Sequence, residues 1–357
     1  MSTTLNPLAN PRGAKKLCEL CQKPAYLQCN NCRVTFYCDT EHQQADWVGI
    51  HDKVCQLLIP IRSAVPFHSL QSDRDLHQSQ TRHRQEQLIE ISRSVAQNKL
   101  FEGKFQESLP ASLLSLRCAM DVYGPSAASL VPAYLLLAEA NVGLGSLAQA
   151  EKYLSQAEWT VTKTPDCSQA VRRQLHRNLG RLYTSTGNLK GALLSFANDV
   201  YYASDEYGLD NIVTKGGYFL MANVFMKQEK KDIAHSMYAE VAKTWHSHLT
   251  RLVEAHTQSS ISLEPCFDEA QRTEADQMLK TMLEVQAQNN KQDVAQIALV
   301  THSLAMLWFL GGSRNKAVEF GRKARQASQL VPDPSLTESI QRLLLLAGPD
   351  PHPTQAS

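Results

Sequence analysis

From about residue 82 onward, apolar and polar residues follow one another with the period of amphipathic helices. Each predicted unit consists of an apolar helix, a turn that contains glycine, and a second apolar helix, as in the stretch "LHRNLGRLYTSTGNLKGALLSFA". The pattern predicts a mostly α-helical fold in which helix pairs follow one another along the chain.

These helix pairs repeat with a period of 42 residues. Small residues recur at one position of the unit, and turn residues recur at a second: Ala96, Ala138, Gly180 and Ala222, then Gly103, Gly145, Gly187 and Glu229. Two further positions hold Ser108, Ala150, Ala192 and Ala234, then Leu154, Phe196 and Tyr238. Small residues let paired helices approach closely, and larger ones fill the gap to the next unit. Self-similarity at this period indicates a solenoid.

The repeat loses its register toward the C-terminus. A further unit, which does not fit the 42-residue period, contains Leu304, Ala305, Trp308, Gly312, Ala317 and Ala324. We therefore expect the stretch 260–290 to hold a degenerate helix pair or an irregular insertion. The last apolar stretch, "PSLTESIQRLLLLAG", is expected to be the capping helix that closes the open end.

The units resemble tetratricopeptide repeats, whose signature positions are matched by Leu179, Gly180, Tyr183, Gly187, Ala192 and Phe196. The resemblance implies an α-solenoid in which the first helix of each pair lines a groove for extended or helical peptides. The period here is longer than the usual one of that family, which implies longer helices or loops.

Within the third unit, Arg173, Arg177 and Arg181 recur every four residues and so form one stripe along a helix. Asn223 occupies the position equivalent to Arg181 in the next unit. Guanidinium groups bind carboxylates in two-point fashion, so we predict that these four residues contact acidic or helical peptide segments in the groove. The alternative is a solvated helix face, which is what most runs of charge are.

Charge and hydropathy narrow the function classes. The net charge is +1, so the chain lacks the general basic field of proteins that bind nucleic acid nonspecifically. The most apolar run, "IALVTHSLAMLWFL", is short and interrupted by polar residues, and the first residues lack the apolar core of a signal peptide. We expect a soluble, cytoplasmic protein that binds neither membranes nor nucleic acid.

Candidate metal ligands are concentrated near the N-terminus, where six of the nine cysteines lie between Cys18 and Cys55. Together with two histidines they form four ligand pairs: Cys18 with Cys21, Cys29 with Cys32, Cys38 with His42, and His51 with Cys55. Mixed thiolate and imidazole ligands are typical of structural zinc, so the eight ligands predict two Zn²⁺ ions. Spacing alone leaves open whether the pairs combine in sequence order or interleave. Thr40 with Gln43 suggests a capping box, and Gly49 is expected to interrupt the helix.

The stretch "YCDTEHQQADWVGIHDKVC" resembles the MYND-type zinc finger, in which the ligand pairs interleave. His42 stands where that family usually has cysteine. The resemblance assigns Cys18, Cys21, Cys38 and His42 to one ion, and Cys29, Cys32, His51 and Cys55 to the other. The family binds short proline-containing peptides, and its motif positions correspond here to Asn30, Gln43 and Trp47. A packing role is the alternative for Trp47, because so small a core needs an anchor.

The expected organisation has five parts: an N-terminal tail (1–14), the zinc finger (15–56), a docked connector (57–81), the tetratricopeptide-like α-solenoid with its capping helix (82–347), and a C-terminal tail (348–357). We expect the finger, which depends on zinc, to fold independently of helices that depend on their neighbours.

Two functions compete. Four protein ligands for each ion leave no position for water, which favours structural zinc and a non-catalytic adaptor or scaffold for protein partners. The families it resembles imply a larger intracellular assembly, with a cilium or the cytoskeleton as one candidate location. The alternative is a SAM-dependent lysine methyltransferase-related protein, but the stretch between Cys55 and the first repeat has no room for a SET domain.

Overall fold

The computed structural model describes residues 2–5, 16–63, 69–258, 269–288, 293–331 and 334–348. The chain divides into two compact units, Met1–Gly187 and Asn188–Ser357. The division falls after the turn of the third predicted repeat, inside the stretch 82–347 that the sequence pattern treats as one solenoid. Each unit is described by itself below.

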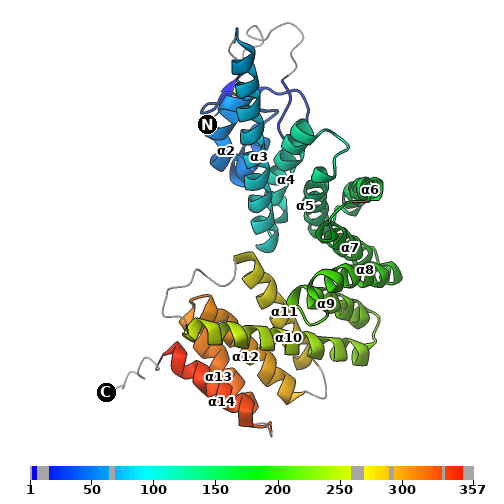
Figure 1. The fold of residues 1–357 in the computed structure, drawn as a ribbon, viewed down its shortest axis with the longest axis vertical. Coiled ribbons are helices and arrows are strands. Elements are labelled where there is room, and N and C mark those ends of the chain that lie inside the picture. Colours follow the sequence, from blue (N-terminus) through cyan, green and yellow to red (C-terminus); the bar gives the residue numbers. More distant parts are fainter. Residues whose placement is uncertain are drawn as a thin grey trace. The chain divides into compact units, whose positions relative to one another are not determined.

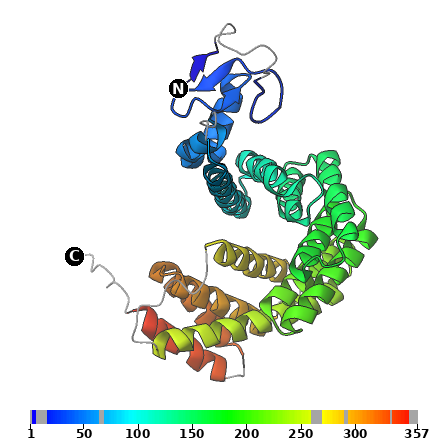
Figure 2. The same ribbon diagram turned by 45° about the horizontal axis from the view of Figure 1, so that its top comes forward.

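The first unit begins with a small antiparallel sheet in the order β1-β2-β3, formed by β1 (Ser2–Thr4), β2 (Leu27–Cys29) and β3 (Phe36–Tyr37). Ser2 pairs with Cys29, and Leu27 pairs with Tyr37. Residues 2–4, which the sequence pattern places in an N-terminal tail, thus supply a strand of the finger (Figure 2).

A continuous helical segment follows the sheet and consists of α1 (Thr40–Asp46), a π-helical turn η2 (Trp47–His51) and α2 (Asp52–Arg62). Asp39 caps α1 by accepting a hydrogen bond from the His42 N–H at 2.7 Å, so the expected capping box at Thr40 and Gln43 was wrong by one residue. The expected interruption at Gly49 was also wrong, because the helix passes through it as a π turn.

Gly49 is required for a different reason, which is the close approach of η2 to α4. A Cβ at this position would lie 2.6 Å from Cγ of Pro110, a rigid ring that cannot rotate away. The glycine therefore lets the finger dock against the helical part of the first unit.

The remaining helices of the first unit are α3 (Gln71–Phe101), α4 (Phe105–Tyr123), α5 (Val131–Gly143), α6 (Leu147–Lys163) and α7 (Gln169–Ser185), with a short 3-10 turn at Ala128–Leu130. α3 packs against α4, and α5 packs against α6, while α4 contacts α5 and both α5 and α6 contact α7 (Figure 1). The stretch 57–81, which the sequence pattern treats as a connector, contains the end of α2 and the first turns of α3.

The second unit contains α8 (Leu189–Tyr207), α9 (Ile212–Lys227), α10 (Lys231–Gln258), α11 (Glu269–Ala287), α12 (Val294–Leu310), α13 (Arg314–Ser328) and α14 (Pro334–Ala347). Neighbouring pairs again pack together, α9 with α10 and α12 with α13. The stretch expected to hold a degenerate pair or an insertion contains, among its described residues, the helix α11, which packs on α12. α14 packs on α13 and α12, and its role as a capping helix stays a prediction.

The backbone reproduces the period found in the sequence. The turn residues Gly103, Gly145, Gly187, Glu229 and Gly312 all adopt a positive φ, between 61° and 82°. Glu229 takes this left-handed conformation without the freedom of glycine, so the turn geometry persists where the glycine is lost. The small residues Ala96, Ala138, Gly180 and Ala222 are all buried. The predicted solenoid-like fold, in which helices pack in neighbouring pairs, is thus confirmed.

One apolar core joins the finger to the first helix pair. Ile50, Val54 and Leu58 of the finger belong to the same buried cluster as Leu88 and Ile89 of α3. This shared core argues against the expectation that the finger folds independently, because its helical face is buried against α3 and α4; independent folding itself stays a prediction.

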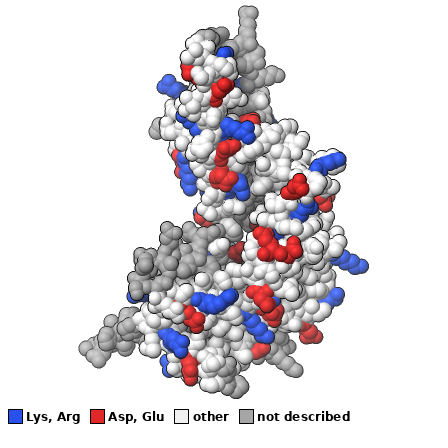
Figure 3. Space-filling model, in the orientation of Figure 1, with Lys and Arg blue, Asp and Glu red and all other residues white. Residues whose placement is uncertain are grey.

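Among the described helices, none combines the length and the apolar character needed to cross a bilayer. On the described part of the face shown in Figure 3, basic and acidic side chains are interspersed, in keeping with the net charge of +1.

Candidate metal centre and binding surface

Two clusters of metal-ligating side chains lie in the finger. The first consists of Cys18, Cys21, Cys38 and His42, and the second of Cys29, Cys32, His51 and Cys55. In each cluster the four ligand atoms lie within 4.8 Å of one another. The interleaved pairing implied by the family resemblance is thus confirmed, and the pairing in sequence order is excluded.

The first cluster is half-buried, and it includes the histidine that departs from the family pattern. The His42 Nδ1 atom lies 2.9 Å from Cys38 Sγ and 3.5 Å from Cys18 Sγ. Cys21 Sγ lies 3.6 Å from Cys38 Sγ. His42 therefore takes part in the site through Nδ1, as an imidazole in place of a thiolate.

The second cluster is fully buried. Cys32 Sγ lies 3.6 Å from His51 Nε2, and Cys29 Sγ lies 4.0 Å from Cys55 Sγ. The π turn places His51 at its end and α2 carries Cys55 one turn later, so both ligands approach from one helical segment. The hydroxyl of Thr35 lies 3.4 Å from Cys32 Sγ and can donate to the thiolate.

Both clusters fit zinc. Zn–S bonds of about 2.3 Å in a tetrahedron place neighbouring sulfur atoms about 3.8 Å apart, which is close to the separations found here. Three thiolates and one imidazole complete a four-coordinate shell from protein atoms alone. The finger thus contains two Cys3His-type sites, one for each of two Zn²⁺ ions.

A buried acid orients one of the histidine ligands. Asp46 lies with Oδ2 3.5 Å from His51 Nδ1, the ring nitrogen that faces away from the cluster, and accepts a hydrogen bond of 2.7 Å from the Tyr37 hydroxyl. Burial, together with the neighbouring Asp46 carboxylate, raises the pKa of Tyr37, so its hydroxyl stays protonated and donates. A carboxylate behind a ligating imidazole fixes the ring orientation and the nitrogen that faces the metal.

A second acid anchors the first CxxC knuckle to the helices. Glu19 accepts hydrogen bonds from both terminal nitrogens of Arg62, at 3.0 and 2.8 Å, and from Arg117 of α4 at 2.7 Å. Arg117 also donates to the Glu19 carbonyl oxygen. Burial alone would raise the pKa of Glu19, but the two guanidinium groups outweigh it and hold the pKa below its usual value. The metal-binding loop is thus tied to α2 and α4.

The three residues predicted to bind peptide are all half-buried. Gln43 and Trp47 lie one turn apart and therefore share a helix face, and the Trp47 ring centre lies 5.8 Å from that of His51. The Asn30 Oδ1 atom has no hydrogen-bond partner among the described residues. The structure brings Gln43 and Trp47 together, while binding of peptide by these residues stays a prediction.

The four groove residues predicted in the helical part are also half-buried. Arg181 forms an ion pair with Glu139, which lies at the equivalent position one repeat earlier. Asn223 accepts a hydrogen bond of 2.6 Å from the Tyr238 hydroxyl. Arg181 and Asn223 therefore have intramolecular contacts, and the binding role of these two residues, with Arg173 and Arg177, stays a prediction.

Residues 18–55 match the family model described as "MYND finger". This segment is therefore a MYND finger, a domain that mediates contacts between proteins. The match does not extend into the helical repeats, so their assignment to the tetratricopeptide family stays a prediction.

Among solved structures, the crystal structure of BtubC (BKLC) from P. vanneervenii is similar to this chain at 15% sequence identity and a TM-score of 0.32. The similarity covers 75% of this chain and 96% of that chain. A likeness at this level identifies no function.

Sequence reasoning missed the residues that support the ligands, namely Glu19, Tyr37, Asp46, Arg62 and Arg117. Asp46 had a usable signal, because an acid on the same short helical segment as a ligating histidine can reach its outer nitrogen. The partners of Glu19 lie 43 and 98 residues away, and nothing in the local sequence indicates them.

Proposed function

We propose that the protein is a non-catalytic adaptor that brings protein partners together through its MYND finger and its helical grooves. The observation that carries this proposal is the closure of both metal sites, each by four protein ligand atoms within 4.8 Å. A catalytic zinc keeps a position for water or substrate, whereas closed shells serve structure. Function then belongs to the outer surface of the finger and to the helices.

The finger would bind short proline-containing peptides beside Asn30, Gln43 and Trp47. An indole face is a suitable surface for a proline ring, and the side-chain amides of Asn30 and Gln43 can pair with the peptide backbone. The contact of Trp47 with His51 supports this role, because it restrains the indole before the peptide arrives.

The helical part would bind acidic or helical segments through Arg173, Arg177, Arg181 and Asn223. Because Arg181 already pairs with Glu139, an incoming carboxylate would share this guanidinium rather than find it unoccupied. Both members of that pair are 32% exposed, which leaves each accessible from solvent.

We place this adaptor in a larger assembly inside the cell, in the cytoplasm, with a cilium or the cytoskeleton as a candidate location. The nearly neutral charge supports a protein partner rather than nucleic acid.

The test is a binding titration of the zinc-loaded full chain with a library of fluorescently labelled proline-containing peptides. Peptides that bind are compared between the natural chain, Trp47→Ala and Tyr26→Ala; Tyr26 is a 66% exposed aromatic residue of the same finger. The proposal expects affinity to fall at least about tenfold for Trp47→Ala and to stay unchanged for Tyr26→Ala.

Equal affinity of all three proteins would contradict the proposed peptide surface. The zinc content of each variant is measured alongside, so that a damaged metal site is recognised. Methyl transfer from S-adenosylmethionine by the purified chain would contradict the non-catalytic part of the proposal and favour a protein related to lysine methyltransferases.

A further inference from the structure

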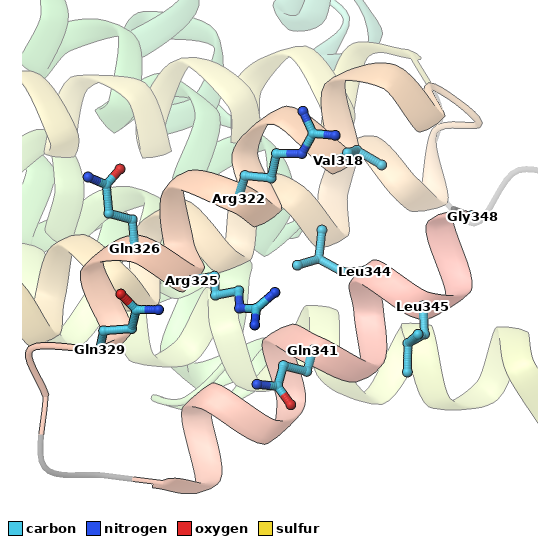
Figure 4. A pocket seen from close by; sticks show the side chains of 9 residues that line it. All are labelled: Val318, Arg322, Arg325, Gln326, Gln329, Gln341, Leu344, Leu345 and Gly348. Atoms are coloured by element: carbon cyan, nitrogen blue, oxygen red, sulfur yellow. The ribbon is translucent and has the colours of Figure 1, made fainter. Parts of the chain in front are cut away.

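The last two described helices of the second unit, α13 and α14, form the walls of an open groove of about 630 Å³. Figure 4 shows its lining, which includes Val318, Arg322 and Arg325 from α13 and Gln341, Leu344 and Leu345 from α14. A hollow of this size accommodates a few side chains of a ligand, not a whole helix.

The helix spacing at this groove is fixed by close packing. A Cβ at Gly321 would lie 2.7 Å from Cδ2 of Leu344, so the Leu344 side chain packs directly on the backbone of α13 at this position. Leu343, the residue before Leu344, is buried in the core of the second unit. The groove is therefore a formed feature of the helix pair.

The lining combines apolar and cationic groups. Val318 and Leu344 form apolar wall, while the side chain of Arg325 extends into the space between the helices (Figure 4). Among the described residues that line the groove, the titratable ones are Arg322 and Arg325, and none is acidic. The charge of the lining is complementary to a carboxylate, which guanidinium groups bind at two points.

The surface of α14 beside the groove is partly apolar. Leu345 is 82% exposed to solvent. This exposed leucine can form an apolar contact with a ligand, and the guanidinium groups of the lining can form the polar contacts.

We propose that this groove binds an acidic amphipathic peptide segment of a partner protein. A carboxylate of the peptide pairs with Arg325, and an apolar side chain of the peptide lies against Leu344 and Leu345. This site is formed by other residues than the finger surface and the stripe of Arg173, Arg177 and Arg181. It rests on the proposed adaptor function and adds to it a second surface for acidic segments.

The test uses two labelled synthetic peptides and fluorescence anisotropy with the zinc-loaded full chain. Both peptides carry leucine at helical i, i+4 spacing, with glutamate at the polar positions of one and lysine at those of the other. The proposal expects binding of the glutamate peptide alone, weakening as salt is raised.

Two variants and two matched controls locate the binding. Arg325→Glu and Leu345→Asp change the groove, whereas Arg342→Glu and Leu330→Asp introduce the same charges at exposed positions outside the lining. The first pair is expected to weaken binding at least about tenfold, and the second pair is expected to leave it unchanged. All four sites are exposed, so circular dichroism and thermal unfolding should match the natural chain.

Four results would overturn the proposal. The first is equal binding of the lysine and glutamate peptides, and the second is binding by Arg325→Glu and Leu345→Asp as tight as that of the natural chain. The third is loss of binding in Trp47→Ala, which would locate the peptide on the finger. The fourth is binding only by a chain ending at Gly348, which would make the C-terminal residues the occupant. Light scattering adds a fifth: a dimer that Leu345→Asp converts to monomer would make a second copy the occupant.

Discussion

The carboxylate of Glu19, between the first two zinc-ligating cysteines, accepts a hydrogen bond of 2.7 Å from the guanidinium of Arg117 on α4, 98 residues later in the chain. Arg62 at the end of α2 binds the same carboxylate. The knuckle that holds the first zinc site is thus fixed to the helices on which the finger rests. This contact and the shared apolar core make the finger and the first helix pair one structural body.

The first prediction concerns the charge of Glu19. Glu19→Gln keeps the shape of the side chain but leaves Arg62 and Arg117 without a counter-charge in a largely buried site. We expect the free energy of unfolding to fall by about 2 kcal/mol in urea titrations, somewhat less than for a fully buried pair because both arginines are partly exposed. Glu86→Gln, which removes a surface ion pair with Arg82, should cost less than about 1 kcal/mol. Equal losses would contradict the anchoring role.

The second prediction concerns zinc removal. A chelator should expose the backbone of α1, η2 and α2, and also loosen α3 and α4, because Ile50, Val54 and Leu58 lie in their core. Hydrogen exchange followed by mass spectrometry measures this segment by segment. The helices α9, α10, α12 and α13 should keep their protection and serve as an internal control. Unchanged protection of α3 and α4 would show that the finger folds independently after all.

The third prediction concerns the histidine that replaces a cysteine. His42→Cys should still bind two zinc ions, because a thiolate restores the family's ligand, whereas His42→Ala should lose or weaken one site. Zinc bound per chain, measured by elemental analysis after gel filtration, distinguishes the two. His83→Ala, at an exposed histidine of α3, is the control and should retain both ions. Full retention of both ions by His42→Ala would remove His42 from the ligand set.

Sequence pattern predicted the features that depend on local spacing. The eight ligands, the buried small residues and the turns at Gly103, Gly145 and Gly187 could be found because each follows from chemistry within one short stretch or from the 42-residue period. The assignment of ligands to ions needed the family resemblance, because spacing allows two arrangements.

Contacts between distant segments could not be predicted in this way. The hydrogen bond between Glu19 and Arg117 and the close approach of Gly49 to Pro110 both depend on where the finger docks. The local sequence around these residues does not indicate that docking position. The long helix α3, whose first turns are mostly polar, lacks the apolar periodicity that marks a helix start. Period and composition therefore predict the units, and tertiary packing decides how the finger is attached.

The fourth prediction concerns the ion pair between consecutive repeats. Arg181→Glu places a second carboxylate opposite Glu139 and should lower the free energy of unfolding by about 1 kcal/mol, because exposed pairs contribute little. Charge reversal of the whole arginine stripe is therefore expected to lower stability as well as to weaken the proposed binding. The double variant Arg181→Glu with Glu139→Arg restores the pair and should recover most of the loss. Additive losses in urea titrations would show that the pair contributes nothing.

The fifth prediction concerns pH and the second unit. His302 of α12 is buried, its Nδ1 atom lies 3.0 Å from Nε2 of His246 on α10, and burial followed by the neighbouring His246 lowers the pKa of His302 to about 3. In the unfolded chain this imidazole titrates near 6.5, so protons bind the unfolded state first. The stability contribution is complete above about pH 6.5 and decreases as the pH falls toward 3, by about 1.4 kcal/mol at about pH 5.5.

Hydrogen exchange of α12 at two pH values, corrected for intrinsic exchange rates, measures this loss. His302→Gln keeps a donor and an acceptor for His246 but does not titrate, so its α12 should show a smaller loss of protection between the two conditions. Identical pH dependence of the natural chain and the variant would assign the effect to other groups.

The central claim is that the protein binds partners through its finger and its helices without performing chemistry. The most direct test is affinity capture with crosslinking mass spectrometry, comparing the natural chain, Trp47→Ala, and the triple variant in which Arg173, Arg177 and Arg181 become glutamate. The account predicts two sets of crosslinked partners, one at the finger that disappears with Trp47→Ala and one at the repeats that disappears with the triple variant. Partners whose crosslinks are unchanged in both variants would contradict it.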